Sequence, residues 1–122
     1  MILDSNLIIY ASRPQHAALR TFIAREVPSL SAISKVETLG YPDLTESEKQ
    51  FLKEFFGAAE VLPVSQSVIS EAIQLRQRRR MSLGDALIGG TALSYDLRLA
   101  TQNATDFDWI EELEIIDPLA SD

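Results

Sequence analysis

The chain opens on Met1-Ile2-Leu3-Asp4-Ser5-Asn6, three apolar residues followed at once by polar ones. This pattern predicts a short buried strand over 1–3 that enters a turn at 4–6. Similar short apolar segments, which predict further strands, occupy 29–33, 61–64, 97–101 and 113–116. Apolar residues at helical spacing and helix boundary signals predict helices over 15–26, 34–39, 45–56, 67–79 and 87–94.

The regular alternation of short strands with helices predicts an α/β fold, in which helices cover both faces of a parallel sheet. The 122 residues, 46% of them hydrophobic, are enough for one core. The sequence shows no repeat, no low-complexity segment and no linker-like stretch. We therefore expect a single domain over 1–122.

The composition excludes several classes of chemistry. The chain has no cysteine, so it can form neither disulfides nor thiolate-ligated zinc sites. No apolar run approaches the roughly 20 residues that span a membrane, and no signal peptide fits ahead of Asp4, so we expect a cytoplasmic protein. The net charge of −7 disfavours nucleic-acid binding unless clustered acids hold a divalent cation, which reverses the local field.

Four acidic side chains follow predicted strands or begin a helix next to one. Asp4 follows the first strand, Glu37 lies one helical turn after the second, and Asp106 follows the strand that ends at Thr101. Asp85 begins the helix that leads into that last strand. Ligands of an open parallel sheet bind at the carboxyl ends of its strands, so these acids can converge at one edge. Crowded carboxylates suit Mg²⁺, which prefers oxygen ligands.

Helix capping is the alternative explanation for each acid taken alone. Asp4 can cap a helix beginning at Ser5. Ser34 to Glu37 and Ser82 to Asp85 both match a capping box. Capping does not explain why four such acids would fall at one edge of the sheet, and a capping carboxylate can still project into a shared site.

Four segments, in order along the chain, resemble the motifs of the PIN-domain family, and in particular its VapC-type toxins. These are Met1-Ile2-Leu3-Asp4-Ser5-Asn6, Ile33-Ser34-Lys35-Val36-Glu37-Thr38-Leu39, Leu83-Gly84-Asp85-Ala86-Leu87-Ile88 and Leu99-Ala100-Thr101-Gln102-Asn103-Ala104-Thr105-Asp106-Phe107. The resemblance covers nearly the whole chain. It implies a three-layer α/β/α fold with a central parallel sheet of four to five strands, and a metal-dependent endoribonuclease.

The resemblance also implies roles for individual residues. Asp4, Glu37, Asp85 and Asp106 match the family's acidic quartet. Asp4 and Asp85 would bind Mg²⁺ (or Mn²⁺ in its place), with Asp106, or Asn103 beside it, supporting the metal. Glu37 would complete the cluster and orient the attacking water. The remaining matched positions, expected to hold the site in shape, are Ser5 and Asn6.

Two further features have two interpretations each. Four arginines before the Asp85 helix can either hold RNA phosphates or form a solvated helix end; they are Arg76, Arg78, Arg79 and Arg80. An apolar stripe on the helix predicted over 45–56 indicates core packing; it consists of Phe51, Leu52, Phe55 and Phe56. The resemblance adds that part of this stripe could bind a cognate antitoxin, and that the protein forms a homodimer.

Two other functions stay open at this stage. The first is a catalytically silent PIN-like module that binds RNA or protein without cleaving it. The second is a metal-dependent phosphatase or receiver-like domain, in which Asp4 would act as a nucleophile. The intact set of four acids argues against the silent module, and capture of a phosphoryl group on Asp4 would reveal the phosphatase or receiver-like domain.

Overall fold

The computed structural model describes residues 1–120 as an α/β domain of six α-helices and five strands. The strands are β1 (Ile2–Leu3), β2 (Leu30–Ser31), β3 (Val61–Leu62), β4 (Leu99–Ala100) and β5 (Ile115–Ile116). The helices are α1 (Ser5–Ala11), α2 (Ala17–Glu26), α3 (Ala32–Leu39), α4 (Glu46–Ala58), α5 (Gln66–Arg78) and α6 (Leu83–Ser94), with a 3₁₀ turn at Ala104–Asp106. No helix of the described residues is long and apolar enough to cross a bilayer.

The five strands form a parallel sheet in the order β3-β2-β1-β4-β5. β4 pairs with β1 on one side and with β5 on the other, β2 pairs with β3, and a parallel bridge between Ile2 and Ser29 joins the two groups. In the register of the central pair, Leu3 lies opposite Ala100. Asp4, which follows β1, and Thr101, which follows β4, therefore lie side by side at the carboxyl end of the sheet.

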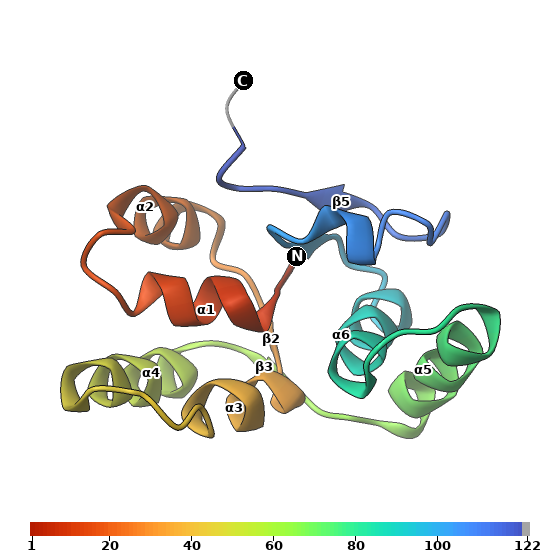
Figure 1. The fold of residues 1–122 in the computed structure, drawn as a ribbon, viewed down its shortest axis with the longest axis horizontal. Coiled ribbons are helices and arrows are strands. Elements are labelled where there is room, and N and C mark those ends of the chain that lie inside the picture. Colours follow the sequence, from red (N-terminus) through yellow and green to blue (C-terminus); the bar gives the residue numbers. More distant parts are fainter. Residues whose placement is uncertain (121–122) are drawn as a thin grey trace.

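Alternate residues of the strands enter two separate cores, which makes the fold three-layered (Figure 1). Ile2 and Leu99 pack with residues of α5 and α6 on one face. Leu3 and Ala100 pack with residues of α1, α2 and α4 on the other. The predicted α/β/α fold with four to five parallel strands is confirmed.

The sequence predicted a turn at 4–6, with a helix capped by Asp4 as the alternative, and the structure contains that helix. Residues 4–6 begin α1, because Asp4 caps it by accepting a 2.8 Å hydrogen bond from the Ser5 N–H. Leu7, Ile8 and Ala11 then lie on one buried face. A seven-residue helix rich in isoleucine has little intrinsic stability, so tertiary burial rather than propensity forms it.

Several predicted boundaries shift. The strand expected over 29–33 is only Leu30–Ser31, and Ser31, not Ser34, caps α3 by accepting from the Ile33 N–H. The capping box at Ser34 and Glu37 is therefore wrong, since both lie inside α3. The helix expected over 87–94, with its entry near Ser82, runs from Leu83 to Ser94, and Ser82 caps it as predicted, because its Oγ accepts from the Asp85 N–H.

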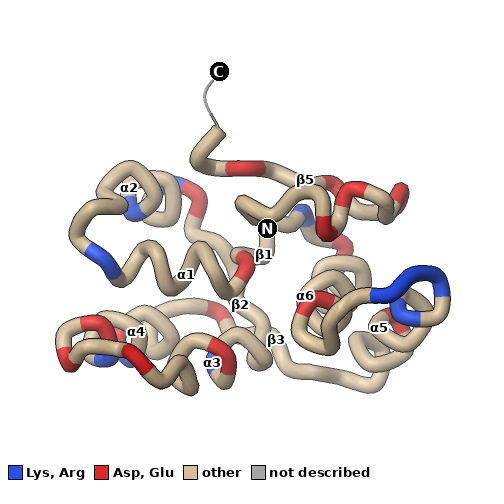
Figure 2. The backbone as a smooth tube through the Cα atoms, viewed as in Figure 1, with Lys and Arg blue, Asp and Glu red and all other residues tan. Residues whose placement is uncertain are grey.

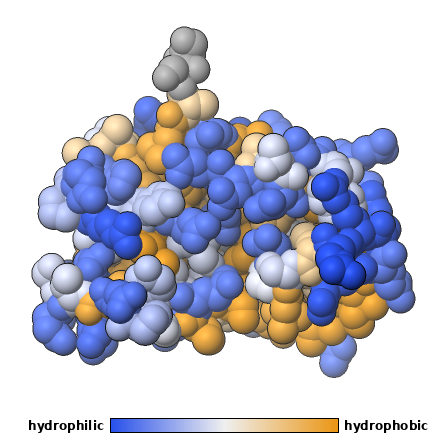
Figure 3. All heavy atoms as spheres, viewed as in Figure 1, coloured by the Kyte–Doolittle hydropathy of each residue, from blue (hydrophilic) through white to orange (hydrophobic). Residues whose placement is uncertain are grey.

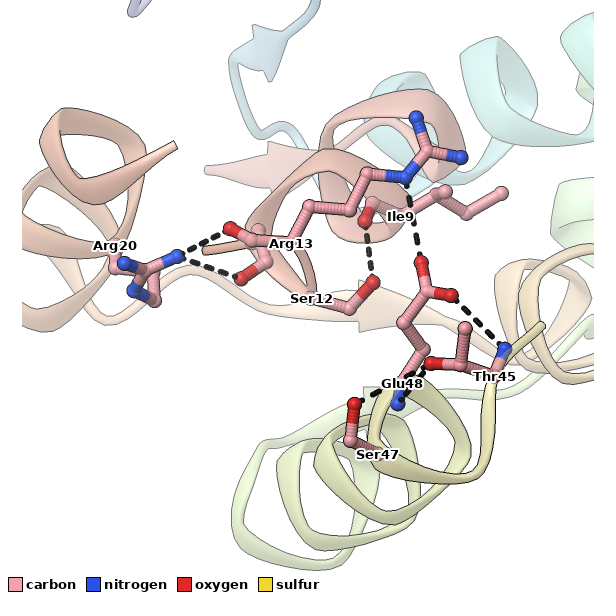
Figure 4. Close-up of polar contacts among 8 residues, drawn as sticks. Ile9, Ser12, Arg13, Arg20, Thr45, Ser47 and Glu48 are labelled. Atoms are coloured by element: carbon pink, nitrogen blue, oxygen red, sulfur yellow. Dashed lines mark hydrogen bonds and ion pairs between the residues drawn. The ribbon is translucent and has the colours of Figure 1, made fainter. Parts of the chain in front are cut away.

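A capping box anchors α4 and ties it to the end of α1 (Figure 4). Thr45 Oγ1 accepts from the Glu48 N–H, and Glu48 Oε1 accepts from the Thr45 N–H at 2.9 Å. Arg13 Nε, just beyond α1, donates to Glu48 Oε2 at 3.3 Å. The hydrogen bonds from Thr45 and the Arg13 charge lower the pKa of Glu48. This network holds the layer of α1 and α4 together on one face of the sheet.

Candidate active site

Asp4 is the most buried of the four acids and lies at the carboxyl end of β1. Its side chain is held from two directions: Oδ1 accepts from the Ser5 N–H, and Oδ2 accepts from Thr101 Oγ1 at 2.7 Å. Burial raises the pKa of Asp4, the charges of Glu37 and Asp106 raise it further, and these two hydrogen bonds oppose the rise. Asp4 is therefore a fixed carboxylate that resists ionisation.

Asp85 lies in the first turn of α6 and is half-buried. Burial raises its pKa first, followed by the charges of Asp4 and Asp106, with a smaller contribution from Glu37. Glu37 and Asp106 thus lie close enough to Asp4 and Asp85 to raise the pKa of both, although the four acids come from four separate segments.

Glu37 reaches the site from α3 through a chain of short contacts. Ser5 Oγ donates to Glu37 Oε1 at 2.8 Å and lies 2.9 Å from Ser34 Oγ. On its other side Glu37 touches α6: a Cβ added to Gly84 would overlap Glu37 Oε2 and lie 3.2 Å from its Cδ. The glycine at position 84 therefore leaves the space that this carboxylate occupies.

The expected supporting residues differ from one another in burial and in hydrogen bonding. Ser5 is buried and contacts the acids, as expected of a positioning residue. Asn6 and Asn103 are exposed, and within residues 1–120 neither side chain forms a hydrogen bond. Thr101 instead bridges the site, since its hydroxyl donates to Asp4 and accepts from the Asn103 N–H at 3.0 Å. Neither Thr101 nor Ser34 was singled out from the sequence for this role.

The donor set suits a hard divalent cation. No acid of the quartet has an ion-pair partner within residues 1–120, so the negative charge is uncompensated. Within residues 1–120, no three acidic or histidine side chains lie close enough together to bind one metal ion, so the metal site is not fully formed. Asp106 is exposed and its carboxylate forms no hydrogen bond within residues 1–120, so it can change rotamer, whereas Asp4 is fixed. The residues therefore fit a cation whose binding completes the arrangement.

The predicted arginines lie at the end of α5 and in the loop that leads to α6, where they form a basic stretch (Figure 2). Arg78 pairs with Glu112 at 2.9 Å, and the guanidinium carbons of Arg78 and Arg79 lie 5.3 Å and 5.5 Å from the centre of the Trp109 ring. The other two, Arg76 and Arg80, are exposed. The basic stretch leads directly into the helix that carries Asp85.

A model of the PIN domain family matches residues 1–113. The chain belongs to the PIN family. Membership supports a hydrolase that acts on nucleic acid in this PIN domain. None of the curated protein sequences matches this PIN domain significantly.

Solved structures share the fold along almost the whole PIN domain. A toxin–antitoxin complex from Klebsiella pneumoniae is 22% identical, with a TM-score of 0.79 over 98% of each chain. DNA-bound VapBC from Salmonella typhimurium is 21% identical, with a TM-score of 0.81 over 96% of each chain. FitAcB from Neisseria gonorrhoeae is 24% identical, with a TM-score of 0.74 over 96% of each chain. At these identities the likeness establishes the fold.

Proposed function

We propose that this PIN domain is a metal-dependent endoribonuclease and the toxin of a type II toxin–antitoxin pair. The observation that carries the proposal is the pair Asp4 and Asp85, whose pKa values are raised by burial and by neighbouring acids while no cation of the described chain compensates them. The family match and the toxin–antitoxin complexes among the structural neighbours support the same assignment.

In this proposal Asp4, Asp85 and Asp106 hold Mg²⁺, for which Mn²⁺ can substitute. When bound, the cation lowers the pKa of a coordinated water and offsets charge on the leaving oxygen. Glu37, held by the Ser5 hydroxyl, orients the attacking water. Thr101 keeps the Asp4 carboxylate in one orientation. Asn103, exposed beside the 3₁₀ turn, would support the metal through water, and Asn6 would help to shape the entrance.

The direct test is cleavage of RNA in Mg²⁺ or Mn²⁺, with loss of activity on chelation. Asp4→Asn and Asp85→Asn should each lower kcat/KM by at least about a hundredfold, because each removes a negatively charged ligand of the cation that would offset charge in the transition state. Asp108→Asn is the matched control: it removes an exposed aspartate near the site that is not part of the quartet. Cleavage that survives both quartet variants would reject the nuclease.

A silent binding module is the second candidate, favoured by the incomplete gathering of the ligands. It predicts RNA binding without metal-dependent turnover. Single-turnover assays in saturating Mn²⁺ separate the two functions, because a silent module leaves the RNA intact even with protein in large excess.

An apolar hollow of about 180 Å³ lies on the outer layer of the fold. We propose that it binds a segment of the cognate antitoxin. It is lined by Ile23, Ala24, Val27, Pro28, Phe55, Ala58 and Ala59, between the ends of α2 and α4. Of the predicted phenylalanine stripe, Leu52 and Phe56 are core, and Phe55 lines this hollow. Ala58→Glu should abolish binding of the cognate antitoxin while RNA cleavage continues; unchanged binding would exclude the hollow.

An exposed apolar surface lies over α5 and α6 (Figure 3). We propose that a second copy of the chain binds this surface and forms a homodimer. Its large exposed apolar side chains include Ile69 and Ile73 of α5 and Leu83 of α6, joined on neighbouring α3 by Val36. An Ile73→Lys variant should be monomeric in sedimentation while the wild type is a dimer. A monomeric wild type would exclude the homodimer. We also propose that the protein acts in the cytoplasm, where its RNA substrate is found.

A further inference from the structure

Trp109 is the only tryptophan of the chain, and it contacts both the basic stretch and the segment that carries Asp106. We propose that Trp109, Arg79 and Arg80 form a binding site for single-stranded RNA beside the quartet, in which one base stacks on the indole and the two arginines hold adjacent phosphates. This inference rests on the proposed function, since it names the residues that present RNA to the same acids.

Trp109 is attached directly to the segment that carries Asp106. Its Nε1–H donates a 3.0 Å hydrogen bond to the Asp106 backbone carbonyl, and its partly buried ring packs against the core around Phe107. The position of the indole is therefore fixed relative to one acid of the quartet. On the other side, residues 79–82 join the arginines to α6, whose first turn carries Asp85.

The two arginines on the indole are held unequally. Arg78 is anchored twice, by its 2.9 Å ion pair with Glu112 and by the ring. Arg79 lies over the same ring but forms no ion pair within residues 1–120. An exposed cation–π contact is among the weaker interactions of a protein surface. A base can therefore replace Arg79 on the indole, and the released guanidinium is then available to a phosphate.

The charge distribution favours nucleic acid over a protein partner. Four of the eleven lysines and arginines fall within the five residues 76–80, in a chain of net charge −7. Arg76 and Arg80, like Arg79, form no ion pair within the described chain, so this charge is available to a ligand. Guanidinium groups beside a partly exposed aromatic ring are the combination with which proteins bind single strands without strict sequence preference. An apolar protein segment would find little to bury here.

Because Trp109 is the sole tryptophan, its emission reports directly on the proposed site. The experiment titrates short unstructured oligo(U) RNA into the full chain carrying Asp85→Asn, which keeps the RNA intact. Stacking of uracil on the indole should quench the emission as RNA binds. Binding observed by anisotropy of labelled RNA without any change in indole emission would overturn the stacking site.

Substitution of the arginines tests the phosphate contacts. Arg79→Gln with Arg80→Gln should weaken binding at least about tenfold and reduce the slope of log K against log salt by about 1.4, or about 0.7 for each lost contact to a single strand. The matched control, Lys49→Gln with Lys53→Gln, removes the same charge from α4 on the opposite layer. Equal losses in the two double variants would mean a general charge effect and overturn the site.

Variants of Trp109 separate stacking from positioning. Both Trp109→Phe and Trp109→Leu lose the hydrogen bond to Asp106, but only Phe keeps an aromatic face. Stacking predicts a KM for RNA near the wild-type value in Trp109→Phe and about tenfold higher in Trp109→Leu, with kcat little changed. Equal loss of kcat in both, with unchanged KM, would show that Trp109 only positions Asp106.

The outcomes also separate this inference from the proposed nuclease. Metal-dependent cleavage by the wild type with no effect of these variants would overturn the RNA site alone. Indole quenching and arginine-dependent binding without any cleavage by the wild type would overturn the nuclease and support the RNA site. A wild type that binds no RNA at all would overturn both.

Discussion

Thr101 Oγ1 donates a 2.7 Å hydrogen bond to Asp4 Oδ2 across 97 positions of the sequence. The register of β1 and β4 places the two residues next to each other, because Leu3 lies opposite Ala100. The same hydroxyl accepts from the Asn103 N–H. The orientation of the most buried acid thus depends on the pairing of the two central strands.

Thr101→Val should weaken Mn²⁺ binding about tenfold, because loss of a hydrogen bond that orients a ligand commonly costs this much affinity. The change keeps the β-branched shape and removes only the hydroxyl. Isothermal titration calorimetry measures the effect. Thr91→Val, which removes another buried hydroxyl from the third turn of α6, is the control and should leave metal affinity unchanged. A similar loss in both variants would contradict the assigned role of Thr101.

Gly84→Ala should separate stability from activity. Alanine favours a helix over glycine by up to about 1 kcal/mol, so thermal unfolding should shift upward or stay unchanged. The new Cβ would displace the exposed end of Glu37, so cleavage should fall. Gly57→Ala in α4, where a Cβ would meet nothing within 4 Å, should raise stability without altering cleavage. Full activity in Gly84→Ala would show that Glu37 need not occupy this position.

The stability of the metal-free protein should fall as the pH rises from about 4 toward neutrality. The pKa values of Asp4 and Asp85 are raised in the folded state, so the folded protein holds protons that the unfolded chain releases near pH 3.9. Their stabilising contribution is complete below that unfolded pKa and disappears as the pH passes the folded pKa. Urea unfolding at a series of pH values measures the slope.

Two comparisons test the origin of that slope. Asp85→Asn should flatten it, whereas Asp43→Asn, at an exposed turn, should not. Mg²⁺ at a hundred times its Kd should add about 2.7 kcal/mol near neutral pH, because it binds only the folded acids. A pH slope that is the same in Asp85→Asn as in the wild type would place its origin elsewhere.

Val27→Asn should stabilise the domain by about 1 kcal/mol. Val27 ends α2 with φ of 46°, a left-handed conformation that a β-branched residue adopts at a cost and that asparagine tolerates better. Its side chain is 77% exposed, so little packing is lost. Val36→Asn, at an exposed and helical position, should destabilise slightly. Chemical denaturation measures the free energy of unfolding of both variants. A Val27→Asn variant less stable than the wild type would contradict backbone strain at Val27.

The sequence predicted the position of Asp4 because an apolar segment followed by polar residues indicates the end of a buried strand. It predicted Asp85 through its capping serine, Ser82, which the structure confirms. It could not predict Thr101, because the partner of Asp4 depends on the order of strands in the sheet, which no local pattern contains. The approach of Glu37 to Gly84 likewise depends on how α3 and α6 pack.

The errors have the same cause. Residues 5–11 form too short a helix for local periodicity to distinguish it from a turn, and burial against α3 and α4 stabilises it. Ser31 rather than Ser34 caps α3, since β2 ends earlier than its apolar pattern indicates. The roles of the four acids, in contrast, stay predictions that only metal binding and cleavage can test.

Gly90 lets the backbone of α6 approach that of α5 so closely that an added Cβ would lie 2.8 Å from the Val68 carbonyl oxygen. This close packing of the two backbones holds the helices in one relative position. The distance between the arginines at the end of α5 and the Asp85 carboxylate in the first turn of α6 is consequently fixed. An RNA strand bound at the arginines would reach the acids after a fixed number of nucleotides. The position of cleavage would therefore be set by its distance from the bound end of the RNA.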